Sequence, residues 1–209
     1  MGLARVNGES STGRRAPAQQ RSREKVRAIL TAARELIVAS GVEALSTRAV
    51  AERAGVPVAS LYQYFAHKQD VVLALVEQDT QEMDRRLAEA VAALERPTVR
   101  AVVRATVETV VGLYRERPAF VVIWCQGRMS PAVLEYTRAH NGRIAEALHA
   151  FGVDSGALPP DTPLSSVRLA VETADRVLEF AFEKDLAGDD QVLREGIEMI
   201  AGYLERPTP

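Results

Sequence analysis

Polar side chains suited to binding a polyanion gather between residues 45 and 68 of the sequence. Arg48 carries the two-pronged donor that fits O6 and N7 of guanine. Thr47 and Ser60 add hydroxyl groups for phosphates or bases, and Lys68 adds a positive charge for a phosphate. The segment therefore predicts hydrogen bonding to nucleic acid, and it contains no arrangement of residues that is typical of catalysis.

Three further residues predict the backbone that positions these groups. Ala51 is small enough for two helices to cross closely, Gly55 allows the positive φ of a tight turn, and Leu61 can pack back onto the first helix. This spacing is typical of a helix-turn-helix, which places its second helix in the major groove of DNA. We expect the recognition helix at about residues 58–65.

The residues around this motif resemble the DNA-binding domain of the tetracycline-repressor (TetR) family of one-component transcription regulators. The resemblance covers roughly residues 22–80. It rests on Ala32-Ala33-Arg34-Glu35-Leu36 through Gly41, Ser46-Thr47-Arg48, Val50-Ala51, Ala54-Gly55-Val56, Ser60-Leu61-Tyr62-Gln63-Tyr64-Phe65 and Lys68. Beyond this region the chain is similar to the family in length and helical character only. The resemblance implies a sequence-specific repressor that a small-molecule effector releases from its operator.

The resemblance also implies which residues contact DNA. Val58 and Ala59 suit a thymine methyl group, whereas the tyrosine hydroxyls suit backbone phosphates. The whole expected set is Thr47, Arg48, Val58, Ala59, Ser60, Tyr62, Gln63, Tyr64 and Lys68. Core packing is the alternative for the aromatic residues; we expect it for Phe65 and expect a phosphate contact for Tyr64.

Two positions depart from the family pattern. Pro57 replaces the usual Ser, Thr or Asp cap of the recognition helix, so the capping hydroxyl is lost although proline suits a helix start. Gln63 stands where many members have a basic or aromatic residue. These departures leave the preferred bases open, but they do not argue against DNA binding.

Proline, glycine and apolar periodicity predict an all-α protein of about nine helices. We expect a flexible basic arm over residues 1–21, a helix-turn-helix domain over residues 22–67 with its motif at 47–66, and a helical effector-binding and dimerisation domain over residues 68–209. The first helix should start near Ser22 and end at Gly41. The further helices are expected at residues 68–95, 98–116, 119–127, 131–152, 164–186 and 190–205.

The charge distribution fits a DNA-binding head on an acidic body. The 209 residues carry a formal net charge of −2, but residues 1–68 hold 11 Lys and Arg against 5 Asp and Glu, whereas residues 69–209 hold 15 against 23. Cys125 is the single cysteine, which excludes an internal disulfide. Because no membrane span or secretory signal is evident, we expect a soluble, bacterial-type protein in the cytoplasm, associated with the nucleoid.

The middle helices contain the residues that could line an effector pocket. They are Tyr114, Trp124, Cys125, Met129, Tyr136 and His140, and they suit an apolar small molecule. Plain core packing is the alternative for each of them. Asp175, Glu179 and Glu183 recur every four residues, which is typical of a solvated or salt-bridged helix face; a cation site is the other interpretation.

The two last helices are apolar on more than one side, which indicates a second partner besides the core. The resemblance implies a homodimer that forms a four-helix interface through them. The residues expected at this interface are Val167, Val171, Leu178, Phe182, Ile197 and Ile200. The partners expected in all are a pseudo-palindromic double-stranded DNA operator, a second copy of the chain and an unidentified small-molecule effector.

Enzyme functions find little support in the sequence. It has no Gly-rich phosphate loop and no Cys/His cluster with metal-ligand spacing, and His67, His140 and His149 are scattered. We therefore expect no catalytic residue, no metal and no cofactor. The remaining alternative is a helical ligand-binding or interaction protein that no longer binds DNA; Arg48, Tyr64 and Lys68 argue against it.

Overall fold

A computed structural model describes residues 15–126 and 130–206 of the protein. The described residues form nine α-helices and no strand, as the sequence predicts. The helices are α1 (Arg15–Ser40), α2 (Thr47–Arg53), α3 (Val58–Tyr62), α4 (Lys68–Ala92), α5 (Val99–Glu116), α6 (Pro118–Val121), α7 (Pro131–Asp154), α8 (Leu164–Phe182) and α9 (Asp190–Leu204), with a π-helical turn, η1 (Val122–Gln126), after α6. No helix in the described part of the chain is long and apolar enough to cross a membrane.

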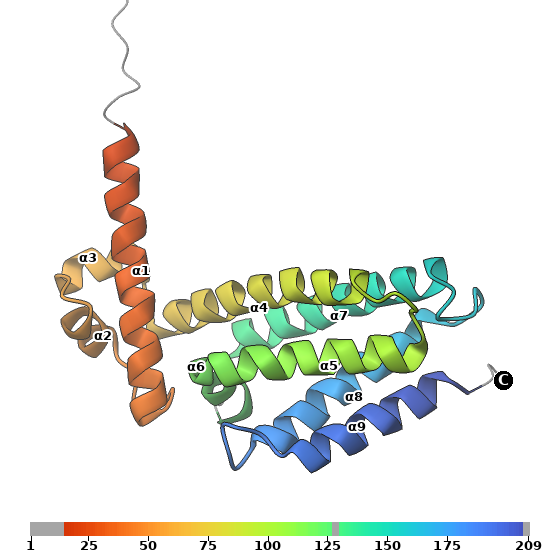
Figure 1. Ribbon diagram of the computed structural model, residues 1–209. Helices are drawn as coiled ribbons and strands as arrows, with labels where there is room; N and C mark the ends of the chain where they lie inside the picture. Colours follow the sequence, from red (N-terminus) through yellow and green to blue (C-terminus); the bar gives the residue numbers. More distant parts are fainter. Residues whose placement is uncertain (1–14, 127–129, 207–209) are drawn as a thin grey trace, which may run out of the picture.

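The helices form a small head and an elongated body. Helices α1 to α3 make up the head, and α4 leaves it to run along the body beside α5 and α7 (Figure 1). Helices α8 and α9 lie side by side at one edge of the body (Figure 1). The core is continuous from Ile29 of α1 to Ile200 of α9.

Local sequence signals explain most of the helix boundaries. The Ser46 and Thr98 hydroxyls accept hydrogen bonds from Ala49 N and Ala101 N, each at 3.2 Å, and so cap α2 and α5. Pro131 opens α7, where its missing N–H costs no hydrogen bond. Gly41 ends α1 with φ of +77°, a conformation that other residues rarely adopt.

Several helix boundaries differ from the sequence prediction. Helix α3 ends at Tyr62 and not at residue 65, and α4 ends at Ala92 and not at residue 95. Helix α1 starts at Arg15 and not near Ser22, so residues 15–21 are helical, while residues 1–14 lie outside the described part. Alanine and glutamine between residues 16 and 20 favour helix, and Pro17 falls in the first turn, where proline is tolerated. Helix α8 ends at Phe182 and not near residue 186, because Asp189 N returns to cap Ala181 O at 2.9 Å. The helix expected at 119–127 is the short α6 followed by η1.

Candidate DNA-binding head and ligand-binding body

The helix-turn-helix has the geometry that its sequence predicts. Val50 and Ala51 of α2 and Leu61 of α3 are fully buried in the core of the head. Gly55 adopts φ of +66° between the two helices, and Val56 N closes the turn with a 3.0 Å hydrogen bond to Ala51 O. This packing fixes the angle between α2 and α3 and leaves one side of both helices exposed to solvent.

The solvent side of the head presents most of the residues expected at DNA. Arg48, Val58, Ala59, Tyr62 and Gln63 are exposed, and Arg48 makes no hydrogen bond or ion pair with any other described residue. Thr47 and Ser60 are half-buried. The Thr47 and Tyr62 hydroxyls lie 3.1 Å apart and tie the start of α2 to the end of α3. One face of the head therefore combines a free guanidinium with small apolar and hydroxyl groups.

Tyr64 and Lys68 use their polar atoms within the protein. Ser22, near which the first helix was expected to start, lies inside α1, and its hydroxyl donates to Tyr64 Oη at 3.1 Å. Lys68 Nζ donates to Glu43 O at 2.9 Å. Either residue can bind a phosphate and keep its internal contact. The Lys68 ammonium has two further N–H donors, and the Tyr64 hydroxyl, which accepts from Ser22, can donate its own proton. Phe65 is buried, as expected.

A group of buried and half-buried polar residues occupies the middle of the body. Trp124 Nε1 donates to Asp175 Oδ1 at 3.0 Å, and Asn141 Nδ2 donates to Asp175 Oδ2 at 3.3 Å. Burial raises the pKa of Asp175 to about 6, although these two hydrogen bonds act against the shift. We call Trp124, Tyr136, His140, Asn141 and Asp175 the central polar cluster; its members come from η1, α7 and α8.

Tyr136 and His140 of this cluster stack on each other. Their rings are 6.1 Å apart and 8° from parallel, and the Tyr136 hydroxyl lies 2.7 Å from Thr80 Oγ1 of α4. His140 is only 1% exposed, and its Nε2 has no hydrogen-bond partner among the described residues. Burial lowers the pKa of His140, with the nearby Asp84 carboxylate opposing the shift. The buried Thr137 hydroxyl also lacks a partner in the described structure.

The structure brings together half of the residues that the sequence assigned to an effector pocket. Trp124, Tyr136 and His140 belong to the central polar cluster, whereas Tyr114 packs edge-to-face on Phe120 and Phe182 in the aromatic core. Met129 and the Cys125 side chain lie outside the described residues. Sequence analysis placed Asp175 on a solvated acidic face, yet it points inward; only Glu179 of that line pairs on the surface, with Arg176 at 2.5 Å.

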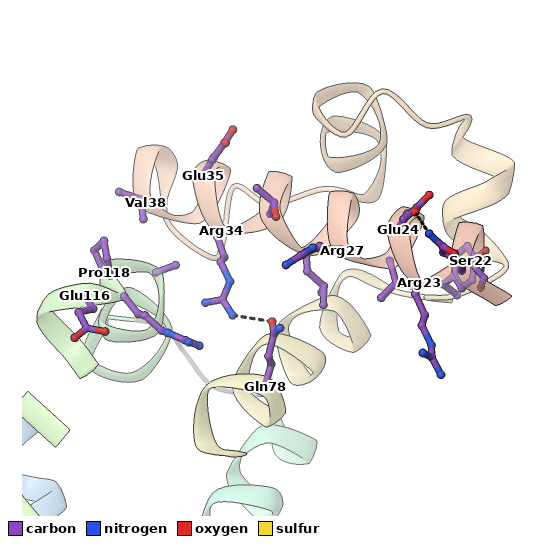
Figure 2. A pocket seen from close by; sticks show the side chains of 17 residues that line it. Ser22, Arg23, Glu24, Arg27, Arg34, Glu35, Val38, Gln78, Glu116 and Pro118 are labelled. Atoms are coloured by element: carbon purple, nitrogen blue, oxygen red, sulfur yellow. Dashed lines mark hydrogen bonds between the residues drawn. The ribbon is translucent and has the colours of Figure 1, made fainter. Parts of the chain in front are cut away.

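Two hollows lie apart from the central polar cluster. An apolar cavity of about 60 Å³ lies among α5, α7, α8 and α9, and the Thr106 hydroxyl at its wall has no hydrogen-bond partner among the described residues. A wide cleft of about 1060 Å³ separates α1 from the segment around Pro118 (Figure 2). Neither hollow is lined by the six residues expected at an effector pocket. No three His, Cys, Asp or Glu residues of the described ranges lie close enough together to hold a metal ion.

Five of the six residues expected at the dimer interface lie in the core of the protomer. Val167, Leu178, Phe182, Ile197 and Ile200 are buried inside the protomer, and Val171 borders the apolar cavity. The outward side of α8 and α9 carries other apolar side chains: Leu169, Phe180 and Met199 are 54%, 57% and 55% exposed. The expected interface is therefore wrong at the level of residues, because the buried stripe of each helix serves its own core.

Two family models match the chain. The model of bacterial regulatory proteins, tetR family, matches residues 29–75, and the model of the tetracyclin repressor-like C-terminal domain matches residues 98–204, more than half of the chain. The chain belongs to the TetR family. TetR-family proteins are DNA-binding transcription regulators with a ligand-binding C-terminal domain, and they act as dimers. This protein is accordingly a DNA-binding regulator and not an enzyme.

Solved structures show the same fold over nearly the whole chain. A TetR-family transcriptional regulator from Streptomyces coelicolor is 29% identical, with a TM-score of 0.70 over 90% of this chain and 99% of that chain. The fatty acid degradation regulator FadR from Bacillus halodurans is 16% identical, with a TM-score of 0.71 over 88% and 97%. RolR, solved with its ligand resorcinol, is 16% identical, with a TM-score of 0.62 over 91% and 98%. No curated protein matches the chain significantly.

Proposed function

We propose that this TetR-family protein represses transcription by binding a pseudo-palindromic operator as a homodimer, and that a small molecule bound in its body releases it. The observation that carries the proposal is the exposed face of α2 and α3, where Arg48 has no partner among the described residues. A free guanidinium at the start of α2 can bind guanine or a phosphate without first breaking an internal ion pair. A DNA target also places the protein in the cytoplasm, on the nucleoid.

The direct test is recovery of operator DNA. The purified protein is mixed with sheared genomic DNA, and the bound fragments are sequenced and then tested singly in gel shifts. We expect fragments that share an inverted repeat, because the two heads of a twofold dimer contact equivalent half-sites. Recovery of fragments without a shared sequence would contradict the proposal.

Replacing Arg48 with alanine should weaken operator binding and relax base preference at one or two positions. Loss of a bidentate contact with guanine costs roughly 1–3 kcal/mol, or about 5- to 150-fold in affinity. Titrating wild type and Arg48→Ala against the operator and its single-base variants measures both effects. Arg85→Ala is the matched control, because Arg85 is an exposed arginine of α4 paired with Glu82 and Glu89. Equal losses on all DNA sequences would show that Arg48 contacts phosphate alone.

The central polar cluster is the proposed effector site. Buried polar atoms without partners are rare in folded proteins and call for an explanation. Thr137 Oγ1 is such an atom, and His140 Nε2 makes no hydrogen bond within the described structure and has the Asp84 carboxylate 3.6 Å away; both atoms belong to α7, close to Asn141. A bound molecule with a ring and a few polar groups would satisfy them while it contacts Trp124 or Tyr136. The effector would then be less apolar than the sequence indicated.

Replacing Asp175 with asparagine should change how stability depends on pH. The folded-state pKa of about 6 lies above the unfolded value of 3.8, so the folded protein binds this proton more tightly. Stability from this residue is therefore present at low pH and lost as the pH rises through 6. From pH 8 to pH 5, wild type should gain about 1.4 kcal/mol in unfolding free energy relative to Asp175→Asn. Urea unfolding at both pH values measures this, and parallel changes in the two proteins would contradict it.

A further inference from the structure

Asp79 of α4 is a charged side chain with no exposure to solvent. Arg34 Nη1 donates to its Oδ2 at 2.7 Å, and Arg34 Nη2 donates to its Oδ1 at 2.8 Å. Arg117 Nη1 donates to Oδ1 as well. Both carboxylate oxygens are thus occupied by guanidinium groups, which compensates for the loss of water around the buried charge.

The two arginines come from different parts of the molecule. Arg34 lies in α1 of the head, and Arg117 is the residue directly before α6 in the body. Asp79 lies between them in α4, the helix that runs from the head into the body (Figure 1). The carboxylate therefore joins the head to the body at one point.

The wide cleft borders the ion pairs of Asp79, because Arg34 and Arg117 both line it. The wide cleft opens between α1 and the segment from Glu116 to Ala119, and Arg34 points from α1 towards α4, with a 3.0 Å hydrogen bond to Gln78 (Figure 2). Helix α1 contacts α4 and α6 directly through the core, and the cleft lies beside this contact. At the edge of the cleft, the ion pairs at Asp79 add a directional polar link between α1, α4 and the residue before α6.

The body side of this bridge leads directly to the central polar cluster. Arg117 precedes α6, α6 continues into η1, and η1 carries Trp124, whose indole donates to Asp175. Arg117 thus lies seven residues before Trp124, and one short helical segment joins them. A shift of Arg117 alters one of the two guanidinium groups that hold Asp79.

We infer that Asp79, with Arg34 and Arg117, is the positioning group of the DNA-binding head: it sets the tilt of α1 against α4 and α6. The use of this tilt in DNA release rests on the proposed function. The tilt itself is a property of the protein alone and can be measured without DNA.

The distance between the two heads of the dimer tests the inference. A nitroxide label at Glu52→Cys, on the exposed side of α2, in a Cys125→Ala background reports that distance by pulsed electron resonance. We expect a narrow distribution in otherwise wild-type protein and at least a twofold broader one in Asp79→Asn and Arg34→Gln. Arg86→Gln is the control, because Arg86 pairs with Glu82 and Glu116 and does not reach the head.

Conservative replacements separate positioning from general stability. Arg117 gives Asp79 one hydrogen bond, so Arg117→Lys should keep the narrow distribution and Arg117→Gln should lose it. Arg34 gives two parallel bonds, which lysine cannot reproduce, so Arg34→Lys should behave like Arg34→Gln. Arg34 and Arg117 are partly exposed, so their replacement disturbs the core less than replacement of the buried Asp79. If Asp79→Asn does not fold, the arginine variants still test the inference.

Operators with one base pair added or removed between the half-sites give the second readout. Wild type should lose at least about tenfold in affinity on them, and Arg117→Gln less than about threefold, because its heads are less constrained. Unchanged distance distributions in folded variants would overturn the inference. Broadened distributions in a protein whose wild type binds no operator would leave the positioning role standing and remove the proposed function instead.

Discussion

Operator affinity should fall by about three orders of magnitude or more when monovalent salt rises from 50 to 200 mM. A protein that contacts some 6–10 phosphates loses about 10³- to 10⁵-fold over this range, because binding releases condensed counterions. Two heads supply this number readily, since each has Arg21, Arg23, Lys25 and Arg27 on α1 besides Arg48 and Lys68. Fluorescence anisotropy with labelled operator at several salt concentrations gives the slope.

The origin of this salt dependence is local charge, because the whole chain has a formal net charge of only −2. Lys68→Ala removes one phosphate contact from each head if Lys68 binds DNA as the sequence indicates, and the slope should then fall by about two for the dimer. Arg85→Ala, on the exposed face of α4, removes the same charge away from the head and should leave the slope unchanged. A flat salt response in wild type would show that contacts other than phosphate dominate.

The helices and the DNA-binding motif could be predicted from the sequence because their signals are local. Gly41 and Gly55 mark backbone that must adopt positive φ, and Pro97, Pro118 and Pro131 fall at the boundaries of helices. Caps and turns act within four residues along the chain, so the sequence contains all that is needed to place them. The start of α1 was missed because a polar helix without an apolar stripe looks like a flexible arm.

The ligand-binding body and the dimer face could not be predicted to the same depth. Helix α8 is apolar on two sides, and periodicity cannot decide whether Leu178 or Phe180 faces the core of the protomer. Asp175 belongs to a regular line of acidic residues, and only the fold shows that it turns inward to Trp124. The contact between Arg34 and Asp79 joins residues far apart in sequence, and no local pattern indicates it.

We propose that the outward face of α8 is the dimer interface, so that a single change there should affect dimerisation strongly. Leu169 and Phe180 are eleven residues apart, which is about three helical turns, so they share this face. Met199 of the neighbouring helix α9 adds a third exposed apolar side chain. A second copy of the chain is the proposed occupant, because members of the family act as dimers and because the buried stripe of each helix is already occupied by the protomer core.

Phe180→Glu should convert the dimer to a monomer and weaken operator binding by about 10²- to 10⁴-fold, because each head then binds its half-site without the help of the other. Light scattering should give the mass of one chain, 22.8 kDa, rather than twice that. Circular dichroism should stay helical, since Phe180 is 57% exposed in the protomer and contributes little to its core. Ala88→Glu, which adds the same charge on the exposed side of α4, should remain dimeric and bind the operator as wild type does. If Phe180→Glu stays dimeric with unchanged affinity, the interface lies on another surface. If the variant is monomeric and still binds the full operator as tightly as wild type, the two heads bind independently.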